Sequence, residues 1–183
     1  MVNNFWNYFV ALEDNLVTCS KYIEFSQKNF STYSIELAHL LLASSSECDV
    51  LFKEVCRLCG DKKSETIKDY FTILSKNLPS IFHEKIVLRR YKLEFNPFDK
   101  WKENNSPLWW NAYNKVKHNR SSDFEKANLD NTLNSMAALM ILNYYWVKII
   151  NKLTDKKEAT LQLKPKSQML YLPDDYYYEN LYV

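Results

Sequence analysis

The residues best suited to chemistry lie in one short stretch, residues 106–120, with the sequence SPLWWNAYNKVKHNR. Ser106 is a preferred helix N-cap and proline is tolerated at the first helical position, so Ser106 and Pro107 predict the start of a helix. Steps of about 100° per residue place the apolar side chains on one face, namely Trp109, Ala112, Tyr113 and Val116.

The opposite face of this predicted helix carries groups that donate, accept and transfer protons. His118 lies there with Asn111 and Asn114, and Lys115 and Lys117 stand at its margins. An unperturbed imidazole has a pKa of about 6.5 and exchanges protons near neutral pH. A purely structural helix more often carries Glu–Lys pairs on its solvent face. The pattern therefore favours acid–base chemistry or anion binding.

The string WWNAYNKVKHNR, followed by FEKANLDNTLNSMAALMILNYY, resembles the HEPN superfamily (higher-eukaryote and prokaryote nucleotide-binding). The resemblance is to bacterial members with a W-W-x-A-Y-N-x-V-K-H-x-R signature. The family pattern is an arginine, often followed by a polar residue, and then a histidine after a short spacer. His118 matches the histidine and Asn114 matches the polar position. No arginine stands at residues 111–113, where the spacing would place it, and the nearest one is Arg120.

The resemblance implies an all-α, single-domain HEPN-like helical bundle over residues 1–153. It leaves two functions open. The first is a non-catalytic module that binds RNA, a nucleotide or a protein, in a phage-defence or toxin–antitoxin system. Its partners would be RNA, an antitoxin or another protein, and a second copy of the chain in a homodimer with the two His118 faces close together. RNA would contact Asn111, Lys115, Lys117 and Trp110, the last at the rim of the polar face.

The second function is a metal-independent endoribonuclease with no cofactor. His118 would be the acid or base, Asn114 would orient the phosphate or hydroxyl, and Lys117 or Arg120 would replace the missing arginine. On a continuous helix Arg120 points toward the apolar side. A catalytic Arg120 therefore requires the helix to end near His118, which Asn119 permits.

Composition sets the class of protein. A chain of 183 residues with 46% hydrophobic and 25% charged residues predicts one globular domain. A single glycine, Gly60, argues against sandwiches and barrels, which need many turn glycines. The net charge of +2 does not by itself indicate nucleic acid. Basic residues do cluster, at 85–92, 115–120 and 148–157, although surface lysines are commonly only solubilising.

The N-terminus lacks a basic start and reaches Glu13 and Asp14 early, which argues against a signal peptide. The apolar run Met136–Ile150 is too short and too polar to span a bilayer. The cysteines therefore indicate a cytoplasmic protein with free thiols. Cys56 and Cys59 form a single C-x-x-C without a second ligand pair, so buried packing is favoured over a metal site.

Periodicity predicts the elements that position the polar face. Helices are expected at 5–26, 32–58, 65–77, 106–120 and 129–153. The expected boundary residues are Asn4, Ser64 and Asn128 as N-caps, Gly60 and Pro79 as terminators, and Ser122 with Glu125 as a capping box. Val87–Phe95 alternates as a strand does, but no partner strand is evident, so it is expected to be an extended connector.

Residues 154–183 are expected to be a polar linker and a tyrosine-rich C-terminal tail that docks on a surface. On the helix at 32–58, Glu36, Glu47 and Asp49 either face the helix of His118 or form a solvated stripe. His39 and His83 are given no role.

Overall fold

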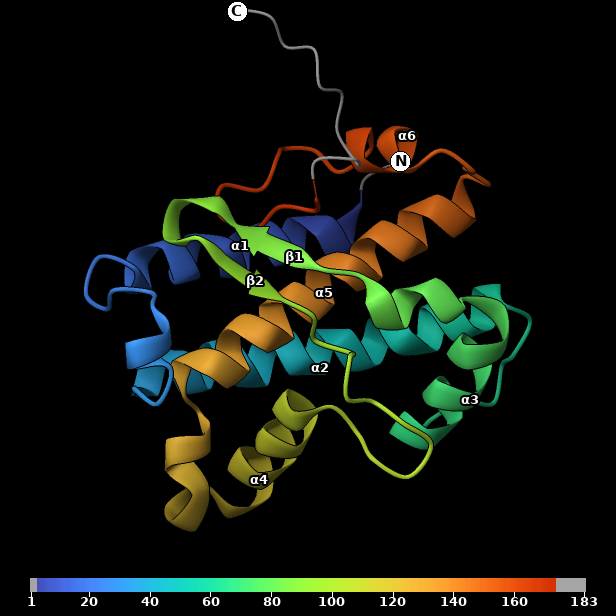
Figure 1. Cartoon of the computed structure of the whole chain (residues 1–183). Coiled ribbons are helices and arrows are strands. Elements are labelled where there is room, and N and C mark those ends of the chain that lie inside the picture. The colour runs from blue at the N-terminus through green and yellow to red at the C-terminus, as the bar shows by residue number, and fades with distance from the viewer. Residues whose placement is uncertain (1–2, 174–183) are drawn as a thin grey trace, which may run out of the picture.

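The computed structural model describes residues 3–173, which are mostly helical with one two-stranded sheet (Figure 1). The α-helices are α1 Asn4–Cys19, α2 Ile35–Leu58, α3 Ile67–Asn77, α4 Leu108–Asp123, α5 Leu129–Ile150 and α6 Lys156–Leu161. The strands are β1 Ile86–Leu88 and β2 Leu93–Phe95, and the 3₁₀ turns are η1 Gln27–Asn29, η2 Pro79–His83, η3 Arg89–Tyr91 and η4 Phe124–Lys126. The expected helical class is confirmed. None of the described helices is both long enough and apolar enough to cross a membrane.

Helices α2 and α5 lie against each other at the centre, with α1 and α4 on opposite sides of the pair (Figure 1). Small polar side chains let the two helices approach closely. The Ser44 and Ser135 hydroxyls are 2.6 Å apart, and the Thr132 hydroxyl donates to the Leu37 carbonyl at 3.2 Å. Helix α5 is buried on almost every side, because α1, α2, α4 and β2 all pack around it.

Several predicted boundaries are confirmed. Asn128 caps α5, its Oδ1 accepting from the Asn131 N–H at 3.0 Å. Gly60 follows the end of α2 with φ of +94°, a left-handed conformation that favours glycine. Helix α3 ends before Pro79, as the steric restriction on the residue before proline requires.

Other boundaries differ from the prediction. Helix α1 ends at Cys19 rather than near residue 26, because the chain must turn to bury Phe25 against Tyr91, with ring centroids 5.1 Å apart. Asn3, not Asn4, caps α1 by accepting from the Trp6 N–H at 3.1 Å.

Helix α2 begins later than predicted. Ser34 is its N-cap, because the Thr32 carbonyl accepts from Leu129 N–H at 2.9 Å and ties that segment to the start of α5. Helix α5 ends at Ile150 rather than at residue 153.

Two predicted caps do not form. Thr66 and Asp69 make the capping box of α3, while the Ser64 hydroxyl donates to Asp61 instead. The Ser122 hydroxyl donates to the Asn119 carbonyl at 3.1 Å rather than capping η4.

The extended connector predicted over Val87–Phe95 is instead a β-hairpin. β1 and β2 pair antiparallel, with Ile86 opposite Phe95 and Leu88 opposite Leu93, and all four side chains are buried. The connection consists of η3 and the following residue, Lys92, which adopts a left-handed φ of +53°. The prediction missed the hairpin because the partner strand is the same run of sequence folded back.

The segment expected to be a polar linker contains α6 and packs on the bundle. Asp155 caps α6, and the chain then runs beside α1 and β1 (Figure 1). The Glu13 carboxylate on α1 is fully buried and accepts hydrogen bonds from the Ser167 hydroxyl and from three backbone N–H groups of residues 168–170. The Tyr171 N–H donates to the Val87 carbonyl at 2.9 Å, which places residue 171 alongside β1. The rest of the tyrosine-rich tail, residues 174–183, lies outside the described residues.

Candidate functional site

Helix α4 begins without the predicted serine cap. Pro107 occupies the cap position, so the Ser106 hydroxyl is free to donate to the side-chain oxygen of Asn111 at 2.8 Å. The Asn111 amide nitrogen in turn donates to the Ser106 carbonyl at 3.4 Å. Asn111 is exposed, but its side chain is engaged in holding the first turn of the helix.

The inner face of α4 is wider than the sequence predicts. Trp109, Ala112, Tyr113 and Val116 are buried as expected. Trp110 was expected to contact RNA from the rim of the polar face, and its placement at the rim is wrong. Its side chain is only 7% exposed, and its ring packs against Phe52 of α2 at 6.1 Å and against Tyr113 at 5.5 Å. A ring enclosed in this way offers no free face for stacking on a base.

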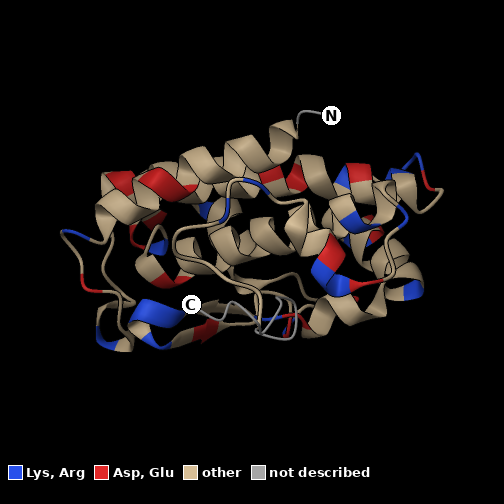
Figure 2. Ribbon diagram, turned by 90° about the horizontal axis from the view of Figure 1, so that it is seen from above, with Lys and Arg blue, Asp and Glu red and all other residues tan. Residues whose placement is uncertain are grey.

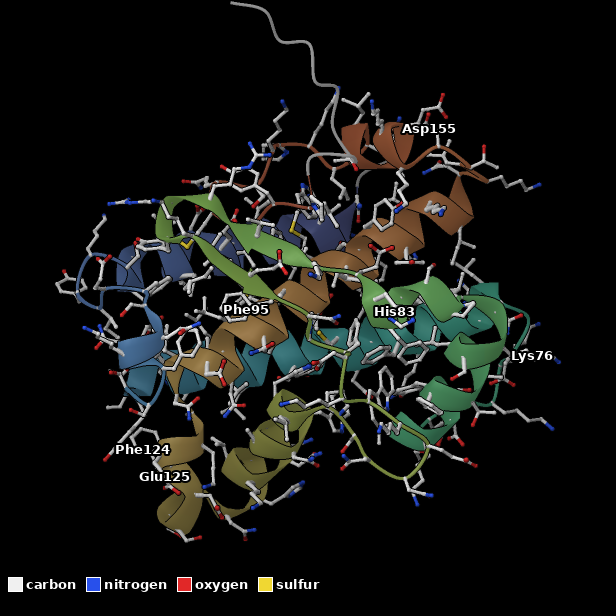
Figure 3. All side chains as sticks on the ribbon, viewed as in Figure 1. Lys76, His83, Phe95, Phe124, Glu125 and Asp155 are labelled. Atoms are coloured by element: carbon white, nitrogen blue, oxygen red, sulfur yellow. The ribbon has the colours of Figure 1, made fainter. Side chains whose placement is uncertain are left out.

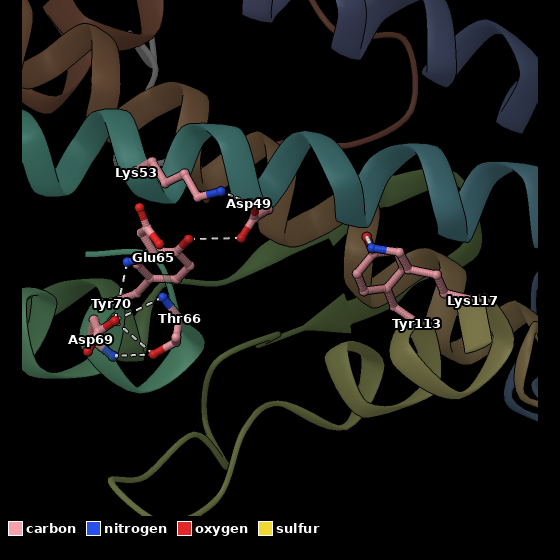
Figure 4. A network of polar contacts seen from close by, with 8 residues as sticks. All are labelled: Asp49, Lys53, Glu65, Thr66, Asp69, Tyr70, Tyr113 and Lys117. Carbon is pink, nitrogen blue, oxygen red and sulfur yellow. Dashed lines mark hydrogen bonds and ion pairs between the residues drawn. The ribbon is translucent and has the colours of Figure 1, made fainter. Parts of the chain in front are cut away.

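The outer face of α4 carries the remaining predicted residues. Lys115, Lys117 and His118 are exposed, and Asn114 is half-buried. Lys117 folds back along Tyr113 toward α2, so that its ammonium nitrogen lies 3.3 Å from the Tyr113 hydroxyl and 5.4 Å from the ring centroid (Figure 4). Within residues 3–173 the His118 imidazole makes no hydrogen bond or ion pair, so both ring nitrogens are accessible to a ligand.

A kink at Asn119 decides where Arg120 lies. Asn119 has φ of −132° and ψ of 40°, which are not helical values and interrupt α4 directly after His118. Arg120 is consequently exposed instead of facing the apolar side of α4. A catalytic role for Arg120 was expected to require that the helix break near His118. The kink at Asn119 meets this requirement.

Beyond the kink, α4 and the start of α2 form a groove, called here the α2–α4 groove. It is lined by Ile35, Ala38, His39, Arg120, Ser121 and Phe124. His39 lies with its Nδ1 3.6 Å from Glu36 Oε2, close enough for an ion pair when the imidazole is protonated. The ring of Tyr33, which is 52% exposed, stands edge-on to Phe124 with centroids 5.6 Å apart. The groove thus combines an arginine, a histidine, a hydroxyl and exposed aromatic surface.

Sequence reasoning missed His39. It stands far from residues 106–120 in the chain, and only the packing of α2 against α4 brings it to the groove that Arg120 lines. No local pattern around His39 signals this. A polar i, i+3 pair with Glu36 is the one feature that could have drawn attention to it.

The other acidic residues that the sequence singled out on α2, Glu47 and Asp49, lie away from the groove. Asp49 forms an ion pair with Lys53 at 2.7 Å and accepts from the Tyr70 hydroxyl at 2.9 Å, so it faces α3 rather than α4 (Figure 4). Burial raises the pKa of Glu47. Neither carboxylate lines the α2–α4 groove.

The basic clusters outside α4 are largely engaged. Lys85 forms an ion pair with Glu94 at 2.6 Å, Arg90 lies over the ring of Tyr91 at 5.4 Å, and Lys148 lies over the ring of Tyr144 at 5.9 Å. Basic and acidic positions are interspersed along the elements in Figure 2. Near His118, Lys117 is engaged by Tyr113 in the same way, whereas Lys115 and Arg120 make no ion pair or ring contact within residues 3–173. These two exposed cations are therefore the best candidates for anion binding.

The cysteine thiols pack in the interior and do not line the candidate site. Cys48 and Cys56 are buried and Cys59 is half-buried, and all are free. Burial raises the pKa of Cys56 to about 12, so its thiol stays protonated and unreactive near neutral pH. Within residues 3–173 no three His, Cys, Asp or Glu side chains are grouped closely enough to hold a metal ion.

Comparisons of the chain with protein-family models, with curated proteins and with solved structures gave no significant match. The HEPN resemblance, and every role that it implies for a residue of α4, therefore stays a prediction.

Proposed function

We propose that the chain is a HEPN-like module that binds single-stranded RNA or a nucleotide along the α2–α4 groove and the outer face of α4. The observation that carries the proposal is the kink at Asn119, which leaves Arg120 in a groove with His39 directly after His118. A guanidinium and a protonated imidazole suit phosphate oxygens, and Tyr33 beside the groove suits a base.

The physiological setting that we propose is a phage-defence or toxin–antitoxin system, with a homodimer as the active form and an antitoxin or other protein as a further partner. This setting rests on the family resemblance of the α4 sequence alone.

A metal-independent endoribonuclease is a second candidate, favoured by His118, which lies next to the kink, is exposed and has no partner among residues 3–173. The 2′-hydroxyl oxygen would attack the adjacent phosphorus while an imidazole removes its proton. The bond from phosphorus to the 5′-oxygen would break, and that oxygen would take up a proton. Arg120 would stabilise the negative charge that develops on the phosphate, and Asn114 would orient it.

Binding is tested first, by fluorescence anisotropy with a labelled single-stranded RNA at several salt concentrations. Arg120→Ala and His39→Ala should weaken binding, and each lost phosphate contact should lower the log–log salt slope by about 0.7. Lys76→Ala is a matched control, because this exposed residue lies at the opposite end of the molecule from Phe124 and the groove (Figure 3). His83→Ala, at an exposed histidine that does not line the groove, is the control for His39→Ala. Wild-type protein that binds RNA no better than a neutral control protein at low salt would refute the proposal.

Catalysis is tested by incubating the protein with mixed RNA in EDTA and analysing the product ends. A 2′,3′-cyclic phosphate that disappears in His118→Ala, with RNA affinity retained, identifies the ribonuclease. Binding without cleavage identifies the module.

A further inference from the structure

A separate cavity lies at the other end of α4. Its volume is about 240 Å³, it is open to solvent on one side, and it is bordered by β2 and the chain that follows it, by the start of α4 and by the first turns of α5. Phe30, Phe95 and Trp109 form its apolar wall, and the rings of Phe30 and Phe95 are 5.9 Å apart. We call it the β2–α5 cavity. It shares no lining residue with the α2–α4 groove.

Its polar wall presents hydrogen-bond acceptors. The Asn131 amide nitrogen donates to the Lys126 carbonyl at 3.0 Å, and the Asn134 amide nitrogen donates to the carbonyl and to Oδ1 of Asp130, each at 3.0 Å. These bonds fix the orientation of both amides, so their oxygens remain as acceptors. The second carboxylate oxygen of Asp130 is a third hydrogen-bond acceptor. A ligand that binds this wall must therefore supply hydrogen-bond donors.

The wall cannot serve as a helix N-terminal anion site, although it includes the first turn of α5. The N–H groups of that turn are already donated: Leu129 to the Thr32 carbonyl at 2.9 Å, Asp130 to the Phe30 carbonyl at 3.2 Å and Asn131 to Asn128 Oδ1 at 3.0 Å. Oxygen atoms of the chain itself thus satisfy the N–H groups that carry the partial positive charge of the helix N-terminus, and none of these three groups is left to bind an anion.

The charge of the cavity is negative. Asp99, Asp130 and Lys100 line it, and Glu94 is neutralised by its 2.6 Å ion pair with Lys85. Two carboxylates against one ammonium leave one unbalanced negative charge. Burial raises the pKa of Asp130, which the charge of Lys100 and the hydrogen bond from Asn134 only partly oppose. A carboxylate that has lost hydration gains from a cation that also donates hydrogen bonds.

We propose that the β2–α5 cavity binds a guanidinium or primary ammonium group at the end of a slender alkyl chain. The group supplies one positive charge and several donors for Asp130, Asn131 and Asn134, while the alkyl chain lies along the accessible side chains of Phe30 and Leu108. The cavity is smaller than the 300–1,000 Å³ or so of drug-sized sites, which suits a group of this size. The group is carried either by a free alkylamine or alkylguanidine, or by a lysine or arginine side chain of a protein.

The indole N–H of Trp109 reports on the cavity, because it donates to the Pro97 carbonyl in the cavity wall at 3.0 Å. In ¹⁵N-labelled protein, ethylguanidinium and n-butylammonium should shift this resonance with dissociation constants of about a millimolar, as expected for fragment-sized ligands. The Trp6 indole, which donates to the Pro165 carbonyl beneath the C-terminal segment, is the internal reference and should not shift.

Further probes define the chemistry and its source. Tetramethylammonium has the charge without donors and should not bind, and Ca²⁺ should not compete. A short blocked peptide with one arginine that binds more tightly than ethylguanidinium points to a protein side chain. The reverse order points to a free amine or guanidine.

Two substitutions should change the affinity for ethylguanidinium in opposite directions. A loss of folding could only weaken binding, so it cannot produce this pattern. Asp130→Asn should weaken ethylguanidinium binding about tenfold, the loss of one charge-assisted contact. Lys100→Gln should strengthen binding several-fold by removing a competing cation. Glu103→Gln, at an exposed carboxylate outside the cavity, should change nothing.

The proposal is overturned if folded wild-type protein shows no Trp109 shift at tens of millimolar probe, if Asp130→Asn binds as well as wild type, or if Ca²⁺ displaces the probes. It does not depend on RNA binding, because the groove and the cavity share no residue. Either proposal can fail alone.

Discussion

Replacing Glu13 tests how the C-terminal segment is held. Its carboxylate has no exposed surface, and it accepts from the Ser167 hydroxyl and from the N–H groups of Gln168 at 2.8 Å, Met169 at 3.0 Å and Leu170 at 3.1 Å. Three of these donors bond to Oε1 and one to Oε2. Glutamine is nearly isosteric, so Glu13→Gln changes the hydrogen bonding with little change in packing.

The cost follows from this geometry. The glutamine oxygen can stand in for Oε1, but its NH₂ group then faces the N–H of Gln168, donor against donor. One hydrogen bond is lost, a buried N–H is left without an acceptor, and the other bonds lose their charge assistance. Hydrogen bonds to charged groups contribute about 1.5–3 kcal/mol each, roughly twice the neutral value. We expect Glu13→Gln to lower the free energy of unfolding by about 2–4 kcal/mol, which corresponds to a fall in Tm of about 6–12 °C.

The assay is urea unfolding followed by circular dichroism, with hydrogen exchange at Met169 and Leu170 as the local readout. Asp14→Asn is the matched control: the Asp14 carboxylate is exposed and accepts from the Gln168 side chain at 2.6 Å, so its change should cost less than about 1 kcal/mol. A Glu13→Gln protein within about 0.5 kcal/mol of wild type, or one no worse than Asp14→Asn, would refute this account of the burial of Glu13.

Two further predictions concern a kink and a cap. Asn119→Ala should favour a continuous α4, turn Arg120 toward the apolar side and weaken RNA binding several-fold in the anisotropy assay. Asn104→Ala, at an exposed loop position, is its control, and an unchanged affinity would contradict the role given to the kink. The pKa of Asp69 lies below its usual range, mainly because its carboxylate accepts a hydrogen bond from the Thr66 hydroxyl. The backbone N–H groups of Glu65 and Thr66 also donate to it and lower the pKa further. Asp69 therefore contributes stability above its unfolded pKa that is lost as pH falls through the lower folded value, so Asp69→Asn should flatten the fall of Tm below about pH 4. An equal fall of Tm in wild type and variant would contradict this.

Helix existence and several helix ends could be predicted because they depend on local chemistry. Asn128 caps α5 because its side chain accepts from the N–H group of Asn131, three residues away. Gly60 follows the end of α2 because the chain adopts a positive φ there, which glycine tolerates best. The hairpin could not be predicted in this way. Its connection through η3 has no Gly or Asn, and Lys92 adopts the left-handed conformation that such residues usually supply.

The candidate site was predicted only where α4 alone determines it. Helical spacing correctly separated Val116 from His118, and it allowed for a break at Asn119. It failed for Trp110, which is buried because Phe52 on α2 reaches it, and it was silent on His39. Both depend on how α2 and α4 pack, a long-range arrangement that periodicity along one helix does not encode.

The bonds between Glu13 and residues 167–170 join parts of the chain that are 154–157 positions apart. A ribosome adds roughly 5–20 residues per second, so α1 is synthesised many seconds before residues 167–170, whose groups donate to the Glu13 carboxylate. During that interval a carboxylate destined for the interior must stay hydrated, and α1 cannot settle fully against α5. The final closure of the fold therefore waits until residues 167–170 have left the ribosome. A nascent chain stalled before residue 167 would keep α1 loosely attached, as a substrate for chaperones and proteases.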